Sequence, residues 1–229
     1  MLLSQDRRRK AKNTAKAGQA TAAIANPQKH PHGKKRVPTG NTTLDLFGGS
    51  HLPEGMKYEE NFLSAAEEQA LLQEIQYLPF REFEFHGFTG KRRTVSFGWR
   101  YDFNGGGLTK TEDMPNFLRN LCVRAERFAG AEPGRFQQVL VTEYAPGAGI
   151  GWHKDRSVFG DVVGISLLSS CTFRLRKRSF KGFTRQNLVA APRSVYLLRG
   201  PFRTEWEHSI PGVERLRYSV TFRDVRDEG

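Results

Sequence analysis

The chain has 229 residues, of which 36 are Lys or Arg and 24 are Asp or Glu, so its formal charge is +12. Its 38% hydrophobic and 11% aromatic content suits a folded domain and excludes a chain that is disordered throughout. No run of about 18 apolar residues occurs, which excludes a membrane-spanning helix.

The positive charge is concentrated at the N-terminus. The first 40 residues carry ten basic residues and one acidic residue, whereas the other 189 carry 26 basic and 23 acidic residues. This segment has no apolar face, so we predict a disordered basic arm over residues 1–42 and one folded domain over residues 43–229. Such an arm binds phosphates in a salt-dependent way; a solvated leader without a role and an organellar transit peptide are the alternatives.

Cysteine content and charge indicate the compartment and the partner. Cys122 and Cys171 are too few for a disulfide framework and fit a reducing compartment. The basic charge suggests a polyanionic partner, nucleic acid above all, and the alternative is a generic basic protein without such a partner. We therefore expect a cytoplasmic monomer, with nucleoid association and organellar targeting by the arm as alternatives.

Two helices are predicted early in the folded part. Ser64 followed by Glu67 matches a capping box, which opens a helix of about 14 residues. Pro115 suits the first turn of a second helix that runs to about Phe128. Apolar residues recur at helical spacing in both segments and should face a core: Leu71, Leu72, Ile75 and Leu78 in the first, and Leu118, Leu121, Cys122 and Phe128 in the second.

From Arg92 onward most segments read as strands, because they are short, rich in Val, Ile, Phe and Tyr, and separated by Gly or Pro. The predicted strands cover residues 94–101, 138–144, 162–168, 172–176, 194–198, 205–209 and 217–222. Two helices followed by many strands predict an α+β domain with an antiparallel sandwich or barrel.

A candidate metal site lies in the segment Trp152-His153-Lys154-Asp155. Residues two apart on an extended segment point the same way, so His153 and Asp155 can converge on one ion, and His208 on a later strand can complete the set. Two imidazoles and one carboxylate form the facial triad of non-haem Fe(II) oxygenases. The alternatives are a surface turn, a histidine paired with a nearby carboxylate, and a zinc hydrolase site.

An arginine pair follows His208 in the segment 217–223. On a strand, Arg217, Ser219, Thr221 and Arg223 share one face. Two guanidiniums on an inward face require anions, which a dicarboxylate cosubstrate supplies through bidentate contacts. The alternative is an arginine stripe on a solvated sheet face. A zinc hydrolase would leave both arginines unexplained.

In order and spacing, these residues resemble the AlkB family of Fe(II)- and 2-oxoglutarate-dependent dioxygenases, from about Tyr58 to Arg226. The resemblance rests on Tyr144-Ala145-Pro146-Gly147, His153, Asp155, His208, Arg217, Ser219 and Thr221-Phe222-Arg223. It implies a double-stranded β-helix, or jelly roll, with N-terminal helices packed outside and a nucleotide-recognition lid.

The resemblance also implies the cofactors and the residues that hold them. His153, Asp155 and His208 would bind Fe(II). Arg217, Arg223 and Tyr144 would bind 2-oxoglutarate, while Thr142 and Ser219 stand where the family usually has Asn. The implied reaction consumes O2 and 2-oxoglutarate, forms succinate and hydroxylates a carbon attached to a base nitrogen, so that an N-methyl group leaves as formaldehyde.

A substrate-binding segment is predicted over residues 90–103. Arg92 and Arg93 precede alternating aromatics at Phe97, Trp99, Tyr101 and Phe103, which would lie on one strand face. Basic residues for phosphates and aromatics for stacking suit a flipped or single-stranded base in DNA or RNA. The alternative is that the aromatics, Phe97 and Trp99 in particular, belong to the core.

The favoured function is oxidative demethylation of alkylated bases in nucleic acid, in DNA or RNA repair. Members of the family that repair bases often have an acid four residues after the first metal histidine, where this chain has Ser157. Phe159 and Asp161 resemble a branch that acts on tRNA, so a tRNA base hydroxylase or demethylase is an alternative. A protein-directed hydroxylase or demethylase would keep the metal and cosubstrate residues without needing the basic aromatic segment. A binding module without catalysis and a structural jelly roll rank below these.

Overall fold

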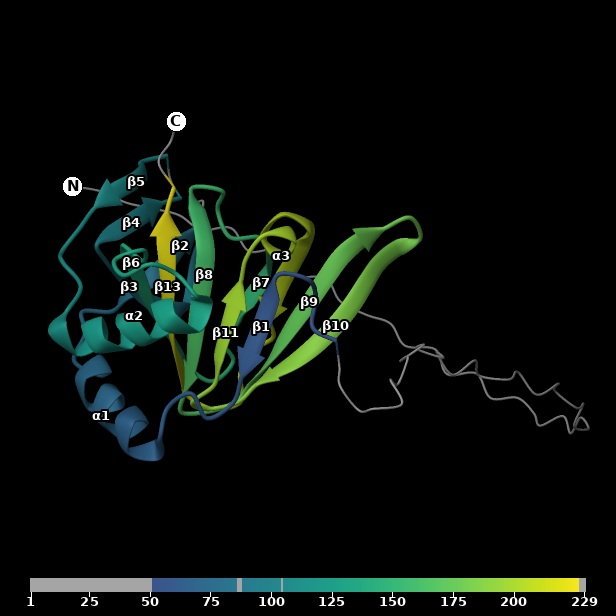
Figure 1. The fold of residues 1–229 in the computed structure, drawn as a ribbon. Helices are drawn as coiled ribbons and strands as arrows, with labels where there is room; N and C mark the ends of the chain where they lie inside the picture. The colour runs from purple at the N-terminus through teal and green to yellow at the C-terminus, as the bar shows by residue number, and fades with distance from the viewer. Residues whose placement is uncertain (1–50, 86–87, 104, 227–229) are drawn as a thin grey trace, which may run out of the picture. The chain divides into compact units, whose positions relative to one another are not determined.

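The computed structural model describes residues 51–85, 88–103 and 105–226. In this part of the chain, two antiparallel sheets pack face to face, and a two-stranded ribbon lies beside them (Figure 1). The predicted arm over residues 1–42 lies outside the described residues, so the arm and the start of the folded domain at residue 43 stay predictions. None of the helices described here has the length and apolar character needed to span a bilayer.

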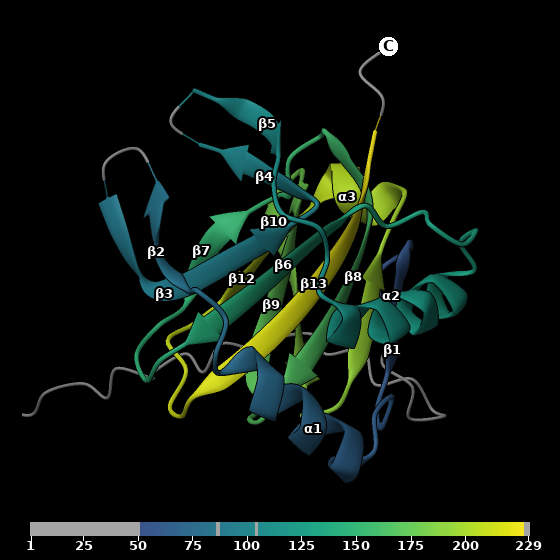
Figure 2. The ribbon, with the colours of Figure 1, turned by 90° about the vertical axis from the view of Figure 1, so that its left-hand side faces the viewer.

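The larger sheet has the strand order β1-β11-β8-β13-β6-β3-β2, and the smaller sheet has the order β10-β9-β12-β7 (Figure 2). The larger sheet comprises β1 (Met56–Glu59), β11 (Val195–Leu198), β8 (Phe159–Leu167), β13 (Arg217–Val225), β6 (Gln138–Tyr144), β3 (Phe88–Phe97) and β2 (Arg81–Phe85). The smaller sheet comprises β10 (Gly182–Ala190), β9 (Cys171–Ser179), β12 (Trp206–Ile210) and β7 (Ile150–His153). The ribbon consists of β4 (Trp99–Asp102) and β5 (Gly107–Lys110). The predicted jelly roll is confirmed.

Among the residues that the structure describes, two of the three helices are the ones that the sequence predicts. In α1 (Ala65–Ile75), the backbone N–H of Glu67 donates to Ser64 Oγ at 3.2 Å, and that of Ser64 donates to Glu67 Oε2 at 2.7 Å. This capping box is confirmed, although the helix has 11 residues. Pro115 is the N-cap of α2 (Asn116–Ala129) and so precedes its first turn. The third helix, α3 (Pro201–Glu205), precedes β12.

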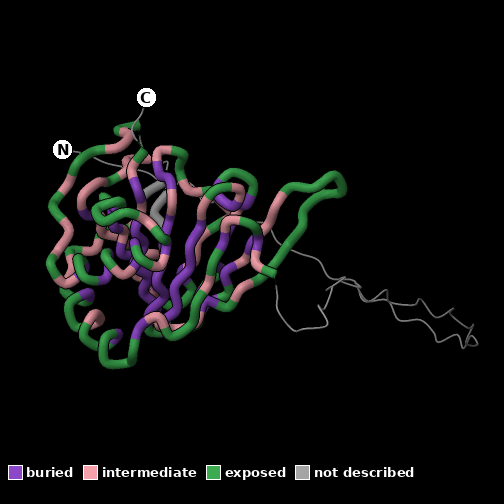
Figure 3. The backbone as a smooth tube through the Cα atoms, in the orientation of Figure 1, coloured by how far each residue is buried: buried purple, intermediate pink, exposed green. Residues whose placement is uncertain are grey.

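The helices α1 and α2 cover the outer face of the larger sheet, where they build one of two cores (Figures 1 and 3). Ile75 of α1 and Leu118 of α2 are fully buried there, together with Val220 and Phe222 of β13. Burial of one such side chain stabilises the fold by about 1.5–3 kcal/mol. Four other residues that the sequence assigns to the core faces of these helices are only partly buried: Leu71, Leu72, Leu78 and Phe128.

The second core lies between the two sheets and carries the polar face of β13. Phe173 of β9 and Leu198 of β11 are buried there. The predicted alternation of β13 is confirmed, because Tyr218, Val220 and Phe222 pack against the helix side. Ser219 and Thr221 line a cavity on the opposite face. A polar strand face inside a jelly roll therefore marks the position of the site.

The predicted strand over residues 94–101 is two strands, because the chain turns at Gly98. Gly98 has φ +77°, and its N–H donates to the Glu112 carbonyl at 2.6 Å. Phe97 before the turn is buried in the helix-side core, whereas Tyr101 after it lies in the separate ribbon. The prediction that Phe97, Trp99, Tyr101 and Phe103 share one strand face is therefore wrong. The alternative, that Phe97 belongs to the core, is confirmed.

Replacing Gly98 with alanine is expected to destabilise the fold more than the same change at Gly130. Both glycines have left-handed backbone, which costs a residue with Cβ about 1–2 kcal/mol. A Cβ at Gly98 would also lie 2.0 Å from the Gln137 carbonyl oxygen, whereas a Cβ at Gly130 has no neighbour within 4 Å. Urea unfolding of both variants measures the difference. Equal losses of unfolding free energy would contradict the close approach at Gly98.

Candidate active site

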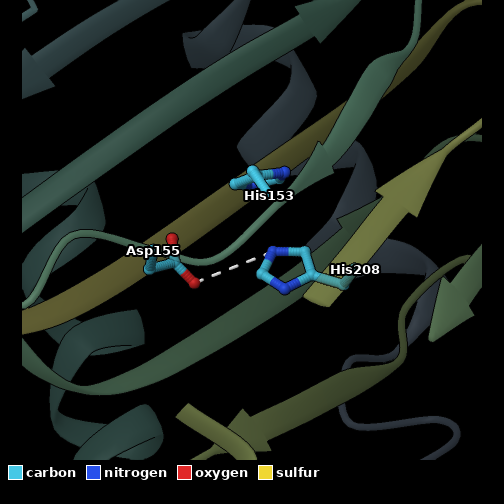
Figure 4. Close-up of side chains that lie close together, drawn as sticks. All are labelled: His153, Asp155 and His208. Atoms are coloured by element: carbon cyan, nitrogen blue, oxygen red, sulfur yellow. Dashed lines mark ion pairs between the residues drawn. The ribbon is translucent and has the colours of Figure 1, made fainter. Parts of the chain in front are cut away.

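Strand pairing brings the two candidate histidines together. His153 is the last residue of β7 and His208 is the middle residue of β12, and the two are register partners in the antiparallel pair. Their ring centroids are 4.2 Å apart. Asp155 follows β7 by two residues, and its Oδ2 lies 3.7 Å from His208 Nε2 (Figure 4). One potential ligand atom from each of the three residues lies within 4.8 Å of the others. The structure thus brings together the three residues that the sequence selects.

The environment of this cluster favours the protonation states that a metal ion needs. Burial lowers the pKa of His208 to about 3, so its imidazole is neutral at physiological pH. Burial alone would raise the pKa of Asp155, but the interaction with His208 and the guanidinium charges of Arg223 and Arg203 outweigh it and hold that pKa well below its usual range. His153 Nδ1 lies 2.9 Å from the Gly151 carbonyl oxygen, which orients its ring. A carboxylate with two imidazoles fits Fe(II).

Arg203, which is buried, and Arg223, which is partly buried, hold the carboxylate of Asp155. Arg223 Nη2 lies 3.3 Å from Oδ1, and Arg203 Nη1 lies 3.3 Å from Oδ2. Arg203 also donates to the carbonyl oxygens of Gly160, at 2.7 Å, and Phe159, at 2.5 Å, and thereby fixes the segment that follows the metal cluster. The role of Arg203 is not apparent from the sequence, because only the folded chain places α3 beside that segment.

Arg217 presents a buried guanidinium that has spare hydrogen-bonding capacity. It is 1% exposed, and its Nε donates to Ser166 Oγ at 3.2 Å. Its Nη1 is buried and has no hydrogen-bond partner among the described residues. Because a buried charge without a counter-ion is costly, this atom fits an anionic ligand such as the carboxylate of 2-oxoglutarate. Ser166 is a neighbour that the sequence did not reveal.

The predicted cosubstrate residues on β6 and β13 lie around this guanidinium. The ring centroid of Tyr144 is 5.0 Å from Arg217 Cζ. Thr142 and Ser219 are register partners, and both are buried and line the cavity. Their short hydroxyl side chains can each donate one hydrogen bond. They therefore supply donors beside Tyr144 at the positions where Asn is usual.

Tyr196 of β11 is a further cavity residue that no sequence pattern indicates. Its ring stacks on Phe173 with centroids 5.0 Å apart. Burial raises the pKa of its phenol, which stays protonated and can donate a hydrogen bond. Gly164 is its register partner, and a Cβ there would lie 2.1 Å from Cζ of Tyr196. Only the register between β8 and β11 reveals why residue 164 is a glycine.

The cluster and Tyr144 line an open cavity of about 1490 Å³. Tyr101 and Phe103 also line it, with ring centroids 5.0 Å apart, and the guanidinium of Arg156 lies over both rings at 4.9 and 5.2 Å. Arg92 lines the cavity with its guanidinium 3.6 Å from the ring centroid of Phe83. The mouth thus combines guanidiniums with aromatic rings.

Two predicted substrate residues do not line this cavity. Arg93 points to the other face of β3, where its Nε lies 2.7 Å from Glu143 Oε1. Alternation along the strand separates it from Arg92. Trp99 directly follows the turn at Gly98 and pairs with Lys110 in the ribbon. The cavity lining therefore does not include Arg93 or Trp99, and their roles in substrate binding stay predictions.

Comparison with known proteins agrees with this site. The sequence model of the 2OG-Fe(II) oxygenase superfamily matches residues 55–223. The alkylated DNA repair protein ALKBH8 homolog of Arabidopsis thaliana is 27% identical over 72% of this chain and 54% of its own length. The tRNA (carboxymethyluridine(34)-5-O)-methyltransferase ALKBH8 of Mus musculus is 26% identical over 72% of this chain and 25% of its own length. The chain therefore spans about half the length of the Arabidopsis relative and about a quarter of the length of the mouse relative.

Solved structures share the fold at lower identity. The structure of OsALKBH1 matches with a TM-score of 0.57 and 16% identity, over 76% of this chain and 99% of that one. A prolyl hydroxylase from Trichoplax adhaerens, in complex with a hypoxia inducible factor peptide, matches with a TM-score of 0.55 and 13% identity, over 76% and 84%. The chain belongs to the 2OG-Fe(II) oxygenase superfamily and is a dioxygenase that depends on Fe(II) and 2-oxoglutarate, with sequence similarity to the AlkB homologues named above.

Proposed function

We propose that this enzyme oxidatively demethylates alkylated bases in nucleic acid. The observation that carries the proposal is the cavity mouth, where Tyr101 and Phe103 lie beneath the guanidinium of Arg156, and Arg92 lies over Phe83. Aromatic rings beside guanidiniums suit the stacking of a base and contacts with its flanking phosphates. We further propose that the enzyme acts as a cytoplasmic monomer.

We assign the metal-binding role to His153, Asp155 and His208. Bound Fe(II), with 2-oxoglutarate and O2, supplies the oxidising chemistry that hydroxylates a C–H bond of the substrate. The chain's own contribution is to keep the imidazole of His208 neutral and the carboxylate of Asp155 charged. Arg203 and Arg223 hold that carboxylate in place through contacts at 3.3 Å.

We assign 2-oxoglutarate to the space beside Arg217 and Tyr144. The unpartnered Nη1 of Arg217 would donate to one carboxylate of the cosubstrate, and the hydroxyl groups of Tyr144 and Ser219 would add hydrogen bonds. Arg223 lies nearer the metal cluster and would meet the cosubstrate's other carboxylate. The apolar walls, such as Phe173, exclude water from the reacting groups.

A base must leave its stack to reach this buried cluster. We therefore expect a flipped nucleotide or a single-stranded segment, held at the mouth by Tyr101 and Phe103. Unstacking costs a few kcal/mol in a duplex and less in a loop, which favours single-stranded or looped substrates.

A tRNA base hydroxylase is a second candidate. Ser157 lies in the cavity four residues after His153, where members that repair bases often have an acid. The relatives from mouse and other animals are described as tRNA methyltransferases, although this chain spans only about a quarter of their length. Of the two residues that resemble the tRNA branch, Phe159 lines the cavity. Asp161 pairs with Arg199 at 2.5 Å and does not line the cavity.

The test is aerobic incubation with Fe(II), 2-oxoglutarate and a panel of substrates. The panel contains 1-methyladenine and 3-methylcytosine in DNA and in RNA, a tRNA with modified uridine, and a methylated peptide. We expect formaldehyde from the methylated oligonucleotides, or a hydroxylated nucleoside from the tRNA if the second candidate holds. Turnover of the peptide with no change in any nucleic acid would contradict the proposal and favour a protein substrate.

A further inference from the structure

The positive charge of the folded part is concentrated in the hairpin formed by β9 and β10. Residues 171–190 include six basic residues and no acidic residue. The other 169 residues from position 41 onward carry 20 basic and 23 acidic residues, so without this hairpin they are net acidic. Figure 1 shows the hairpin extending beyond the strands that it adjoins. A segment of this charge is suited to a polyanionic partner.

The arginines of the hairpin gather on one face. Phe173 and Leu175 of β9 are buried between the sheets, so the alternate residues Arg174, Arg176 and Arg178 point outward. Arg185 of β10 is the register partner of Arg176 and belongs to the same face. These four residues are here called the arginine face.

The folded chain leaves most of this charge uncompensated. Arg176 pairs with Glu207, but no carboxylate among the described residues lies within ion-pairing distance of Arg174, Arg178 or Arg185. Arg176 and Arg185 are like charges directly opposite each other, an arrangement that destabilises a sheet. Such a pairing is explained by a ligand more readily than by folding.

Aromatic rings are interleaved with these guanidiniums. The ring centroid of Phe183 lies 4.4 Å from Arg176 Cζ and 5.5 Å from Arg185 Cζ. At the tip of the hairpin, Phe180 is fully exposed. Basic side chains with aromatic rings between them are typical of surfaces that bind single-stranded nucleic acid.

Trp152 connects the arginine face with the active-site cavity. It precedes His153 and lines the cavity, and its ring lies beneath Arg174 and Arg176 at 5.1 and 4.4 Å. A strand whose target base enters the cavity can therefore continue across Trp152 onto the arginine face.

We infer that the arginine face binds the sugar-phosphate backbone of the substrate nucleic acid next to the target base. This inference rests on the proposed function. It adds a second contact surface, on the smaller sheet, to the aromatic mouth formed by the ribbon. Its contacts are with phosphates, so it contributes affinity and position rather than sequence selectivity.

The test is the double variant Arg178→Gln with Arg185→Gln in the full chain. Both side chains are exposed, so the variant is expected to fold and to keep its 2-oxoglutarate turnover on a free methylated nucleoside. Anisotropy titrations with a single-stranded RNA and with DNA of the same sequence should show about tenfold weaker binding at moderate salt. The slope of log K against log salt should fall by about 1.4, which corresponds to two lost phosphate contacts on a single strand.

The matched control is Arg119→Gln with Arg127→Gln, which removes two exposed arginines from α2 and should leave affinity and slope unchanged. Weaker binding of RNA or of DNA by the Arg178 and Arg185 double variant supports the inference and shows which nucleic acid the arginine face contacts. If the Arg178 and Arg185 double variant bound both oligonucleotides with wild-type affinity and salt dependence, and still oxidised bases, the inference would be overturned. The proposed function would then still stand. Binding of the arginine face to anionic phosphatidylserine vesicles but to neither oligonucleotide would also overturn it. Failure of the wild-type enzyme to oxidise any base would instead overturn the proposed function.

Discussion

Replacing His153 with alanine is expected to abolish Fe(II) binding and turnover. The change removes one of three ligand atoms that lie within 4.8 Å of one another. Loss of a hydrogen bond to a metal ligand already costs about 10- to 100-fold, so loss of the ligand itself should cost more than about 100-fold. His153 is only half-buried at the end of β7, so the variant should remain folded. Calorimetric titration with Fe(II) under anaerobic conditions and succinate measurement by NMR check the two effects.

The matched control is His51→Ala, because His51 is an exposed histidine outside the cavity. It should bind Fe(II) and form succinate at the wild-type rate. Retention of metal affinity and activity by His153→Ala would remove His153 from the ligand set. Loss of both in the His51 variant would indicate that the assay responds to histidine content rather than to this site.

Arg217→Ala is expected to weaken 2-oxoglutarate binding by about 10- to 150-fold, with Fe(II) affinity retained. This range corresponds to the loss of one hydrogen-bonded charge contact, about 1.5–3 kcal/mol. The basis is the buried Nη1 that has no partner among the described residues, beside Tyr144 and Ser166. Calorimetry with 2-oxoglutarate in the presence of Mn(II) in place of Fe(II) separates cosubstrate affinity from turnover.

Two further variants test whether the loss of 2-oxoglutarate affinity is specific to the guanidinium of Arg217. Arg217→Lys keeps the charge but not the planar fork, so it should recover only part of the affinity. Arg124→Ala removes an arginine that pairs with Glu67 between the helices at 2.5 Å, and it should leave cosubstrate affinity unchanged. An unchanged 2-oxoglutarate affinity in a folded Arg217→Ala protein would exclude Arg217 from the cosubstrate site.

The parts of the site that the sequence predicts depend on local rules. His153 and Asp155 are two residues apart on an extended segment, and Arg217 to Arg223 alternate along one strand, so strand geometry alone places their side chains. The chemistry of the residue types then restricts the choice, since two imidazoles and a carboxylate suit few ions. The capping box at Ser64 is local in the same sense and is confirmed.

The parts that the sequence does not predict depend on contacts between distant segments. The turn at Gly98 follows from the approach of the Gln137 carbonyl, which no pattern in residues 91–103 indicates. Ser166 and Tyr196 enter the site only through the register of β8 with its neighbouring strands. Arg203 reaches Asp155 from α3, 48 positions further along the chain. In each case the missing information is a contact between segments that are distant in the sequence, and residue type alone does not supply it.

The central claim is that this centre couples the decarboxylation of 2-oxoglutarate to the oxidation of a base in nucleic acid. The most direct measurement is the ratio of succinate formed to base oxidised, by mass spectrometry, for one oligonucleotide carrying a single methylated base. We predict a ratio approaching one, with both products absent in His153→Ala. Succinate formation that is independent of the oligonucleotide, with the mass of the base unchanged, would contradict the claim.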